Sequence, residues 1–388
     1  MKTLSKNILI LSPFFFPEPI STGKFNTNFA LELRDKGHSV TILCFHPFYP
    51  DWKSKKSNNQ LKGIKIIRGG KNLFYSKKTI FRRFVLEIGY AFFVLRKLFK
   101  YKNKIDIVVP VFPPSFAFFS VISFLKSIKK VGMVHDLQEI YSSTKKGVFN
   151  KFITYFINKI EKKCFKNCDR LIFLSNEMKD VANELYNLDE TKLEVQYPFH
   201  SIKNKITNDL ENILSSETIN IVYSGALGDK QNPEKLYNFF DYSSKKTKNL
   251  KFYFFSQGTI FNNLKDKNKN QDINFYDLVN RENLEELYHR SSVQIVPQKE
   301  KTSKGSLPSK LPNLLITGCK ILVITDRNSE IETLFRTNNL YSVTNSWNNE
   351  VLLTTLKELI DKDLDIAHQI EVSKDLFTID KMIDKILY

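Results

Sequence analysis

Short apolar runs alternate with longer segments of helical periodicity along the first half of the chain. The first run, Asn7–Ser12, is followed by a polar loop and by a helical pattern over 25–36 that stops at Gly37. The same order of strand, loop and helix recurs in three later segments, 104–129, 130–135 and 170–185. Strands that alternate with helices in this way indicate βαβ units, so the pattern predicts a doubly wound parallel sheet.

The alternation breaks after Pro198, where the chain is polar and irregular as far as Glu217. Strand and helix patterns then resume at Ile219 and continue to the end of the chain. We therefore predict two Rossmann-like domains, residues 1–198 and 199–369. We expect a C-terminal helix, about residues 370–388, to pack back on the first domain. Because ligands bind at the carboxyl ends of parallel strands, we expect the two domains to face each other across a cleft that holds the site.

One segment, 107–125, is uncharged and nominally long enough to cross a membrane. Its three prolines, Pro110, Pro113 and Pro114, would interrupt a spanning helix, so we interpret it as a strand, a turn and a short apolar helix from Ser115. No signal-peptide pattern precedes the first strand, and nothing in the sequence directs export. These features predict a cytoplasmic protein.

The 388 residues include 59 Lys and Arg against 41 Asp and Glu, a formal charge of +18 that attracts anionic partners. No aromatic-interleaved RNA motif, zinc finger or helix-turn-helix pattern accompanies this charge, so a nucleic-acid partner is disfavoured. The four cysteines, Cys44, Cys164, Cys168 and Cys319, lack the paired spacing of a structural zinc site.

The segment 221–234, IVYSGALGDKQNPE, combines a strand end with two glycines and a lysine. Gly225 and Gly228 allow backbone amides to approach a ligand, and Lys230 follows within reach of a phosphate. The segment predicts an anion-binding loop, although a glycine turn with a solvated lysine has the same pattern. Neither this loop nor the one after the first strand has the G-x-G-x-x-G spacing of a dinucleotide site.

A second anion site is predicted in the segment 293–323, VQIVPQKEKTSKGSLPSKLPNLLITGCKILV. After a strand and a polar loop, Ser309 is expected to cap a helix whose first turn holds Lys310 and Pro312, and Gly318 is expected to end it. Free amides at the helix start and the Lys310 ammonium would together bind an anion. A capped helix with a surface lysine is the simpler alternative.

Six motifs in this order resemble the family 4 glycosyltransferases of the GT-B fold: SPFFFPEPISTGKFNTNFALELRDKGHSVTIL, PVFPPSFAFFS, MVHDLQEI, IFLSNEMKD, YSGALGDKQ and LPSKLPNLLITGCKIL. They cover nearly the whole chain. Within the family, the sequence is similar to the branch that builds bacterial surface polysaccharides such as O-antigen, capsule or exopolysaccharide, which includes fucosyl- and N-acetylfucosaminyltransferase-like enzymes.

The resemblance implies a retaining transfer of a hexose or N-acetylhexosamine from a nucleotide diphosphate sugar, with a uridine donor favoured and no metal ion or other cofactor. The acceptor would be a lipid-linked saccharide at the inner face of the cytoplasmic membrane. In this family pattern Lys230 corresponds to the lysine that binds the diphosphate, and Lys310, Ser309 and nearby amides would bind its other side. Fixed cations of this kind stabilise charge as it develops on the leaving group.

The sequence departs from the general family pattern at two glutamates, whose positions are here Gly305 and Asn313, and at an arginine, replaced by Ala226. The P-S-K form is common in the polysaccharide branch, so we interpret the change as a subfamily variant. Asn313 would then hydrogen-bond the ribose or sugar. The missing glutamates also suggest the alternative of a catalytically silent GT-B subunit that binds nucleotide sugar or a partner glycosyltransferase.

In the first domain, the resemblance places His135 near the donor sugar and the acidic residues that follow it near the acceptor. Asp136 or Glu139 would orient or deprotonate an acceptor hydroxyl, whereas a helix cap or ion-pair partner is the ordinary role of such a carboxylate. Gly23 corresponds to the glycine that lets the loop after the first strand approach the donor. An ordinary turn would explain it equally.

A basic amphipathic helix is predicted over 77–104, KKTIFRRFVLEIGYAFFVLRKLFKYKNK, where Glu87 is the only acid. Its apolar positions at helical spacing are Phe81, Phe84, Val85, Ile88, Phe92, Leu95 and Phe99. Its flanking cations are Arg82, Arg83, Arg96, Lys97 and Lys100. Such a helix is typical of an anionic membrane interface. The alternative is an inner helix whose apolar face belongs to the domain core.

Overall fold

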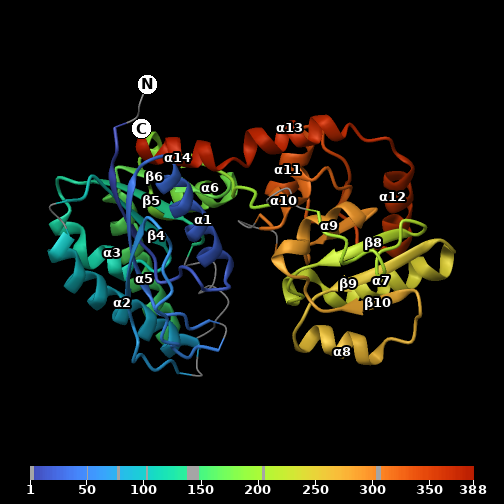
Figure 1. The fold of residues 1–388 in the computed structure, drawn as a ribbon, viewed down its shortest axis with the longest axis horizontal. Coiled ribbons are helices and arrows are strands. Elements are labelled where there is room, and N and C mark those ends of the chain that lie inside the picture. The colour runs from blue at the N-terminus through green and yellow to red at the C-terminus, as the bar shows by residue number, and fades with distance from the viewer. Residues whose placement is uncertain are drawn as a thin grey trace. The chain divides into compact units, whose positions relative to one another are not determined.

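The computed structural model describes residues 4–49, 51–76, 79–101, 104–137, 148–202, 206–302 and 307–388. It divides the chain into two compact α/β units (Figure 1). Unit 1 comprises residues 1–197 and 379–388, and unit 2 comprises residues 198–378. The first boundary, after Tyr197, lies one residue before the predicted one. The second boundary, where the chain returns from unit 2 to unit 1, lies after residue 378, nine residues later than the predicted 369.

Unit 1 contains a seven-stranded sheet in the order β3-β2-β1-β4-β5-β6-β7, with every pairing parallel. Its strands are β1 (Asn7–Leu11), β2 (Ser39–Phe45), β3 (Ile64–Gly69), β4 (Ile107–Phe112), β5 (Lys129–Val134), β6 (Arg170–Phe173) and β7 (Leu193–Val195). The order reverses between β1 and β4, which makes that point the topological switch of the sheet. The predicted doubly wound parallel sheet is confirmed.

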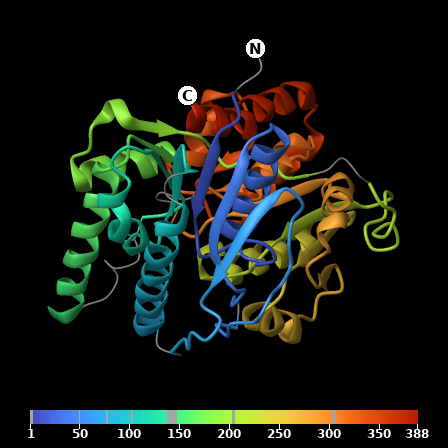
Figure 2. The ribbon, with the colours of Figure 1, turned by 60° about the vertical axis from the view of Figure 1, so that its left-hand side comes forward.

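Alternate side chains of these strands point to opposite faces, and helices cover both. One face packs against α2 (Thr79–Tyr101), α3 (Phe116–Val121) and α5 (Val148–Lys166), as Figure 2 shows from a second direction. The other face meets α1 (Ser21–Asp35), which also contacts α14 (Ile379–Leu387). The other helices in the described part of the unit are α6 (Asn176–Tyr186) and the short η2 (Ile122–Phe124) and η3 (Glu190–Lys192).

The prolines of segment 107–125 lie as predicted in a strand and a turn, since β4 includes Pro110 and ends at Phe112. Across the described residues, no helix is both long and apolar enough to cross a membrane. Ser175 caps α6, with its hydroxyl oxygen 3.1 Å from the amide of Met178. The predicted start of the first helix at Phe25 is wrong, because α1 begins four residues earlier at Ser21.

Unit 2 contains a six-stranded parallel sheet in the order β10-β9-β8-β11-β12-β13. Its strands are β8 (Ile219–Ser224), β9 (Leu250–Phe255), β10 (Ile273–Tyr276), β11 (Val293–Pro297), β12 (Ile321–Ile324) and β13 (Val343–Thr344). Its helices are α7 (Pro233–Lys246), α8 (Thr259–Lys267), α9 (Leu284–Arg290), α10 (Leu311–Ile316), α11 (Glu330–Thr337), α12 (Asn349–Asp361) and α13 (Ile366–Leu376). The topological switch of this sheet lies between β8 and β11.

The helix α14 belongs to unit 1 although it follows unit 2 in the sequence. Met382, Ile383 and Ile386 are fully buried on one side of it, in keeping with their spacing of about one helical turn. Arg170 donates a hydrogen bond to the carbonyl of Lys385 at 2.6 Å, and Lys385 forms an ion pair with Glu194 at 2.9 Å. This last helix therefore packs on the unit in which the chain begins.

We expect Ile383→Ala and Ile386→Ala each to destabilise unit 1 by about 2–5 kcal/mol, because each leaves a cavity in a fully buried position. Urea unfolding, followed by a probe in each unit, would measure this loss. The matched control is Asp384→Ala on the exposed side of α14, which should change stability little. Equal stability of all three variants would show that α14 is not part of the unit 1 core.

Candidate functional site

A pocket of about 300 Å³ opens in unit 2. Its lining includes four of the residues predicted from sequence, Gly225, Lys230, Ser309 and Lys310. They come from the segments that follow β8 and β11, the two strands that flank the topological switch. The segments that follow β8 and β11 therefore line one pocket.

Lys310 occupies a split between β8 and β11. The register between these strands ends at Val222 and Gln294. Just beyond that point, the Lys310 Nζ donates hydrogen bonds to the carbonyls of Ser224 at 3.1 Å and Ile295 at 3.0 Å. An ammonium group has three N–H donors, so these carbonyls account for two of them and leave one for a ligand.

The Lys310 ammonium is buried and also contacts an aromatic ring. Its Nζ lies 4.5 Å from the centre of the Tyr223 ring, a favourable cation–π distance. Burial disfavours the charged form and lowers the pKa of Lys310 to about 7, from an ordinary value of 10.5. The charge of Lys310 near neutral pH therefore depends on what lies in the pocket.

The amides of the two glycines in the loop after β8 both bond to other groups of unit 2. The Gly225 amide donates to the carbonyl of Phe255 at 3.0 Å, and the Gly228 amide donates to Oε1 of Gln231 at 3.0 Å. Both of these amides are bonded within unit 2, and the approach of other backbone amides to a ligand stays a prediction. Gly225 needs to be glycine because its φ of +128° is strained for other residues. The reason is not steric, since the space where a Cβ would stand is open.

Lys230 lies in a single helical turn after β8, and its side chain is exposed. Its carbonyl accepts a hydrogen bond from the Lys299 amide at 2.7 Å, and the Lys299 ammonium pairs with Asp229 at 2.9 Å. These contacts join the loop after β8 to the loop after β11. The two lysines that line the pocket are thus unlike: Lys310 is fixed in the sheet, whereas Lys230 is on the surface.

The helix predicted after Ser309 is shorter than expected and is not capped by that residue. It begins at Leu311, Lys310 occupies the N-cap position, and no side chain caps it. Pro312 lies in the first turn and Gly318, with a φ of +70°, follows the last turn, both as predicted. Ser309 is therefore an exposed residue that lines the pocket and not a helix cap.

Asn313 makes a structural contact. Its Oδ1 accepts a hydrogen bond of 2.7 Å from the amide of Ser201, in the segment that enters unit 2. Sequence reasoning assigned this side chain to a ligand because it occupies a position where relatives have glutamate. The other such position, Gly305, lies outside the described residues.

Several apolar residues of the pocket were not predicted, among them Phe255, Leu278, Val279 and Tyr288. Phe255 is the last residue of β9, and Leu278 and Val279 follow the end of β10. The rule that ligands bind at the carboxyl ends of parallel strands would have found these three. Tyr288 projects from α9, and no sequence signal marks it.

In unit 1, His135 and Asp136 follow β5, as predicted. The His135 ring lies edge-on to Phe25, with centroids 4.6 Å apart, and its Nε2 is 3.2 Å from the Met133 sulfur. Burial of the ring lowers the pKa of His135 to about 3, so its imidazole is neutral at pH 7. The Asp136 Oδ1 accepts a hydrogen bond from the Leu137 amide at 2.9 Å. Glu139 lies outside the described residues.

Gly23 lies in the first turn of α1, rather than in the predicted loop. A Cβ at this position would stand 3.1 Å from both the carbonyl oxygen and the Cβ of Glu18, so glycine permits a close approach of helix and loop. Glu18 is itself buried, and its carboxylate accepts hydrogen bonds from the amides of Phe48 and Tyr49. Gly23 therefore fixes the path of the chain after β1.

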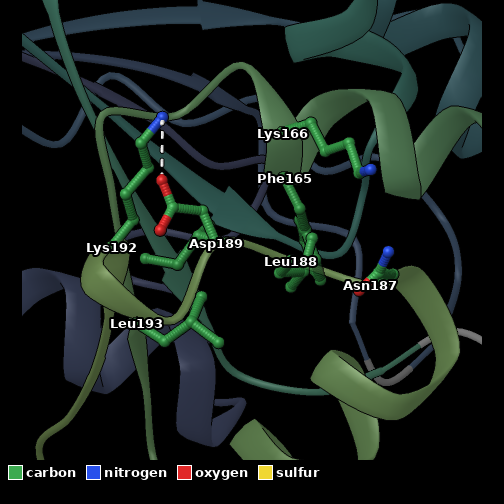
Figure 3. A pocket seen from close by; sticks show the side chains of 8 residues that line it. Phe165, Lys166, Asn187, Leu188, Asp189, Lys192 and Leu193 are labelled. Atoms are coloured by element: carbon green, nitrogen blue, oxygen red, sulfur yellow. Dashed lines mark ion pairs between the residues drawn. The ribbon is translucent and has the colours of Figure 1, made fainter.

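A second pocket, of about 380 Å³, lies in unit 1 (Figure 3). Its lining includes Phe165, Leu188 and Leu193, together with Lys192, whose ammonium is 3.9 Å from the Asp189 carboxylate. These residues precede or begin β6 and β7, so the pocket lies at the amino ends of the strands. It includes none of the predicted residues. Within the described ranges, no three His, Cys, Asp or Glu side chains cluster as a metal site would require.

We expect Asn313→Ala to lower the free energy of unfolding by about 1–3 kcal/mol, because it leaves the Ser201 amide without its acceptor. Asn313→Asp, which keeps an oxygen at the same place, should restore most of this loss. Urea unfolding of the two variants checks the assignment. If the alanine variant were as stable as wild type, the contact would not stabilise the fold, and a ligand role for Asn313 would regain support.

Comparison with known proteins gives a family match and a fold. Residues 22–202 match the family model described as Glycosyltransferase Family 4. No curated protein matches the sequence.

Solved structures resemble the whole chain. The glycosyltransferase WaaG, described as involved in lipopolysaccharide biosynthesis, has 13% identity and a TM-score of 0.68 over 98% of this chain and 99% of its own. Sucrose-phosphate synthase from Thermosynechococcus elongatus has 11% identity and a TM-score of 0.70 over 98% of each chain. The catalytic domain of starch synthase IV from Arabidopsis thaliana, bound to ADP and acarbose, has 10% identity and a TM-score of 0.67 over 98% of this chain and 99% of its own.

At these identities the structural likenesses establish the fold, two Rossmann-like domains of the GT-B type. The family match adds the class of reaction. The match of residues 22–202 to the Glycosyltransferase Family 4 model and the GT-B fold over nearly the whole length together support a glycosyltransferase.

Proposed function

We propose that the chain is a retaining glycosyltransferase that moves a hexose or N-acetylhexosamine from a nucleotide diphosphate sugar to a lipid-linked saccharide. The observation that carries the donor assignment is the Lys310 ammonium, held in the split between β8 and β11 and lining one pocket with Lys230. Two cations at the switch point of a parallel sheet suit a diphosphate.

The chemistry of transfer explains why two lysines are useful there. Cleavage of the bond between the anomeric carbon and the diphosphate leaves additional negative charge on the diphosphate oxygens. Cations that are already in position stabilise this charge without reorganising. Lys310 is fixed and partly desolvated, which strengthens its effect, and Lys230 is exposed and adaptable. With both ammonium groups in place, the proposed reaction uses no metal ion.

The remainder of the pocket suits a nucleoside. Because adjacent strands are about 4.8 Å apart, the carboxyl ends of β10 and β11, three strands away from each other, are about 14 Å apart. The β9 and β10 end is apolar, with Phe255, Leu278 and Val279, and the β8 and β11 end is cationic. We place the base at the apolar end and the diphosphate at the cationic end. A uridine base is favoured by the resemblance to the polysaccharide branch.

Unit 1 would then bind the acceptor. His135 is neutral at pH 7 and can exchange hydrogen bonds with a sugar hydroxyl, and Asp136 can orient one. The acceptor in this proposal belongs to bacterial surface polysaccharide synthesis, so the enzyme would act at the inner face of the cytoplasmic membrane. WaaG, whose fold this chain shares, acts in lipopolysaccharide biosynthesis.

A silent GT-B subunit remains the second candidate. It is favoured by Asn313, which stands at a family glutamate position and whose Oδ1 is bonded to Ser201. Such a subunit would bind nucleotide sugar without turning it over. Hydrolysis of the donor in the absence of acceptor, a common side reaction of transferases, separates an enzyme from a silent subunit.

We expect Lys230→Ala and Lys310→Ala each to lower turnover of the identified donor by about a hundredfold, the scale lost with one stabiliser of a developing anion. Lys235→Ala is the matched control, because Lys235 lies nearby on α7 but pairs with Glu300. Far-UV circular dichroism would check that each variant is folded. Turnover within about threefold of wild type for both pocket variants would refute the diphosphate assignment.

We also expect the affinity for UDP to fall as pH rises from about 7 to 9. The pKa of Lys310 is about 7 in the empty pocket, and a bound diphosphate favours the charged amine, so binding above pH 7 takes up a proton. Phosphate groups titrate near pH 6, so the ligand contributes little above pH 7.

Calorimetry at several pH values, in buffers that differ in ionisation enthalpy, measures both the affinity and the proton uptake. Lys310→Arg is the control, since an arginine stays charged throughout this range and should flatten the pH dependence. The same decline in the arginine variant would assign the titration to another group.

A further inference from the structure

The helix α2 has two apolar faces, and only one of them belongs to the core of unit 1. Leu86, Tyr90, Val94 and Leu98 recur at helical spacing and are almost fully buried in that core. The predicted apolar face, by contrast, is largely exposed. Five of its residues form a row that we call the α2 ridge. They are Phe81 (60% exposed), Phe84 (60%), Ile88 (42%), Phe92 (68%) and Phe99 (53%).

The geometry of the helix places the ridge opposite the core. At about 100° per residue, the ridge side chains fall within roughly 80° of one another, on the side away from the buried stripe. From Phe81 to Phe99 the ridge extends about 27 Å along the helix. Phe124 of η2 continues it, since its ring lies 4.8 Å from that of Phe99 and it is 41% exposed. Figures 1 and 2 show α2 on the outside of unit 1.

A row of large exposed apolar residues is unusual on a protein surface and marks a contact with a partner or a membrane. The charges of α2 indicate which. Arg96 and Lys100 are exposed and lie about 60° and 100° around the helix from Phe99, so they flank the ridge on one side. Arg82 instead lies 4.0 Å from the Trp52 ring. The one acid of α2, Glu87, is buried and accepts a hydrogen bond from the Phe116 amide.

We infer that the α2 ridge docks on an anionic lipid bilayer, with the phenylalanines among the acyl chains and Arg96 and Lys100 at the phosphate groups. A helix with aromatic residues on one face and cations beside them suits that boundary. A second copy of this chain fits less well, because a symmetric contact along the ridge would bring the cations of two helices to one interface without an exposed acid on α2 to pair them. The inference rests on the proposed function only in that a lipid-linked acceptor would give the docking its purpose.

The experiment is co-sedimentation of the full chain with vesicles of phosphatidylcholine alone or mixed with phosphatidylglycerol. We expect binding to the anionic vesicles and little to the neutral ones. A ridge variant, Phe81→Gln with Phe84→Gln and Phe92→Gln, should bind at least tenfold more weakly. A charge variant, Arg96→Gln with Lys100→Gln, should bind about thirtyfold more weakly and lose most of its sensitivity to salt.

Two controls match these variants in unit 2. Val351→Gln with Ile366→Gln removes exposed apolar residues, and Lys248→Gln with Lys269→Gln removes the same charge as the charge variant. Both should bind as wild type does. As an independent measurement, an environment-sensitive fluorophore is attached to the new thiol of the Phe92→Cys variant. The labelling is selective because the four native cysteines are buried. Its emission should shift to the blue with anionic vesicles.

Failure of wild type to bind anionic vesicles, or full binding by the ridge variant, would overturn the inference. So would a dimer of wild type in sedimentation velocity that the ridge variant loses, because the ridge would then be a contact between copies. Nucleotide binding, measured without lipid, tests the proposed function separately. A chain that binds vesicles but no nucleotide would keep the docking surface and lose the proposed donor.

Discussion

Parallel strands that diverge leave backbone carbonyls without partners, and in unit 2 a single ammonium group bonds to two of them. The pairing of β8 and β11 ends at Val222 and Gln294, and Lys310 bonds the carbonyls of Ser224 and Ile295 just beyond. A charged side chain could remain in so buried a place only with such partners. The split that it occupies is the topological switch of the sheet, and the pocket with Lys230 and Gly225 opens there. The proposed donor site thus depends on the contact that holds this edge of the sheet together.

The same arrangement gives the two lysines different surroundings. Lys310 is fixed by the backbone and its protonation responds to the pocket, whereas Lys230 is an exposed cation on a loop tied to its neighbour through Lys299. Unit 1 shows a comparable use of close packing: Gly23 lets α1 approach Glu18, and His135 is kept neutral by burial beside Phe25. In both units the side chains of interest follow the carboxyl ends of parallel strands.

Sequence patterns predicted the two doubly wound sheets and two anion-binding segments, because both follow from strand order and from the position of loops after strands. They did not predict side-chain partners. The Gly225 and Gly228 amides, the Asn313 carboxamide and the Ser309 hydroxyl were assigned from residue type, but their partners depend on tertiary contacts that no local pattern encodes. The exposed face of α2 was ambiguous for a similar reason. Periodicity finds an apolar face, and only packing shows that the core uses the opposite one.

The most direct test of the donor site is a thermal-shift screen of UDP, GDP, TDP and ADP, with their sugars, on wild type and on Lys310→Ala. A ligand at a hundred times its dissociation constant adds about 2.7 kcal/mol to the stability of the folded protein. The account predicts that at least one nucleoside diphosphate, with a uridine compound favoured, raises the melting temperature of wild type and raises that of Lys310→Ala much less. If no nucleotide stabilises wild type, or if the best one stabilises both proteins equally, the pocket at the split between β8 and β11 is not the donor site.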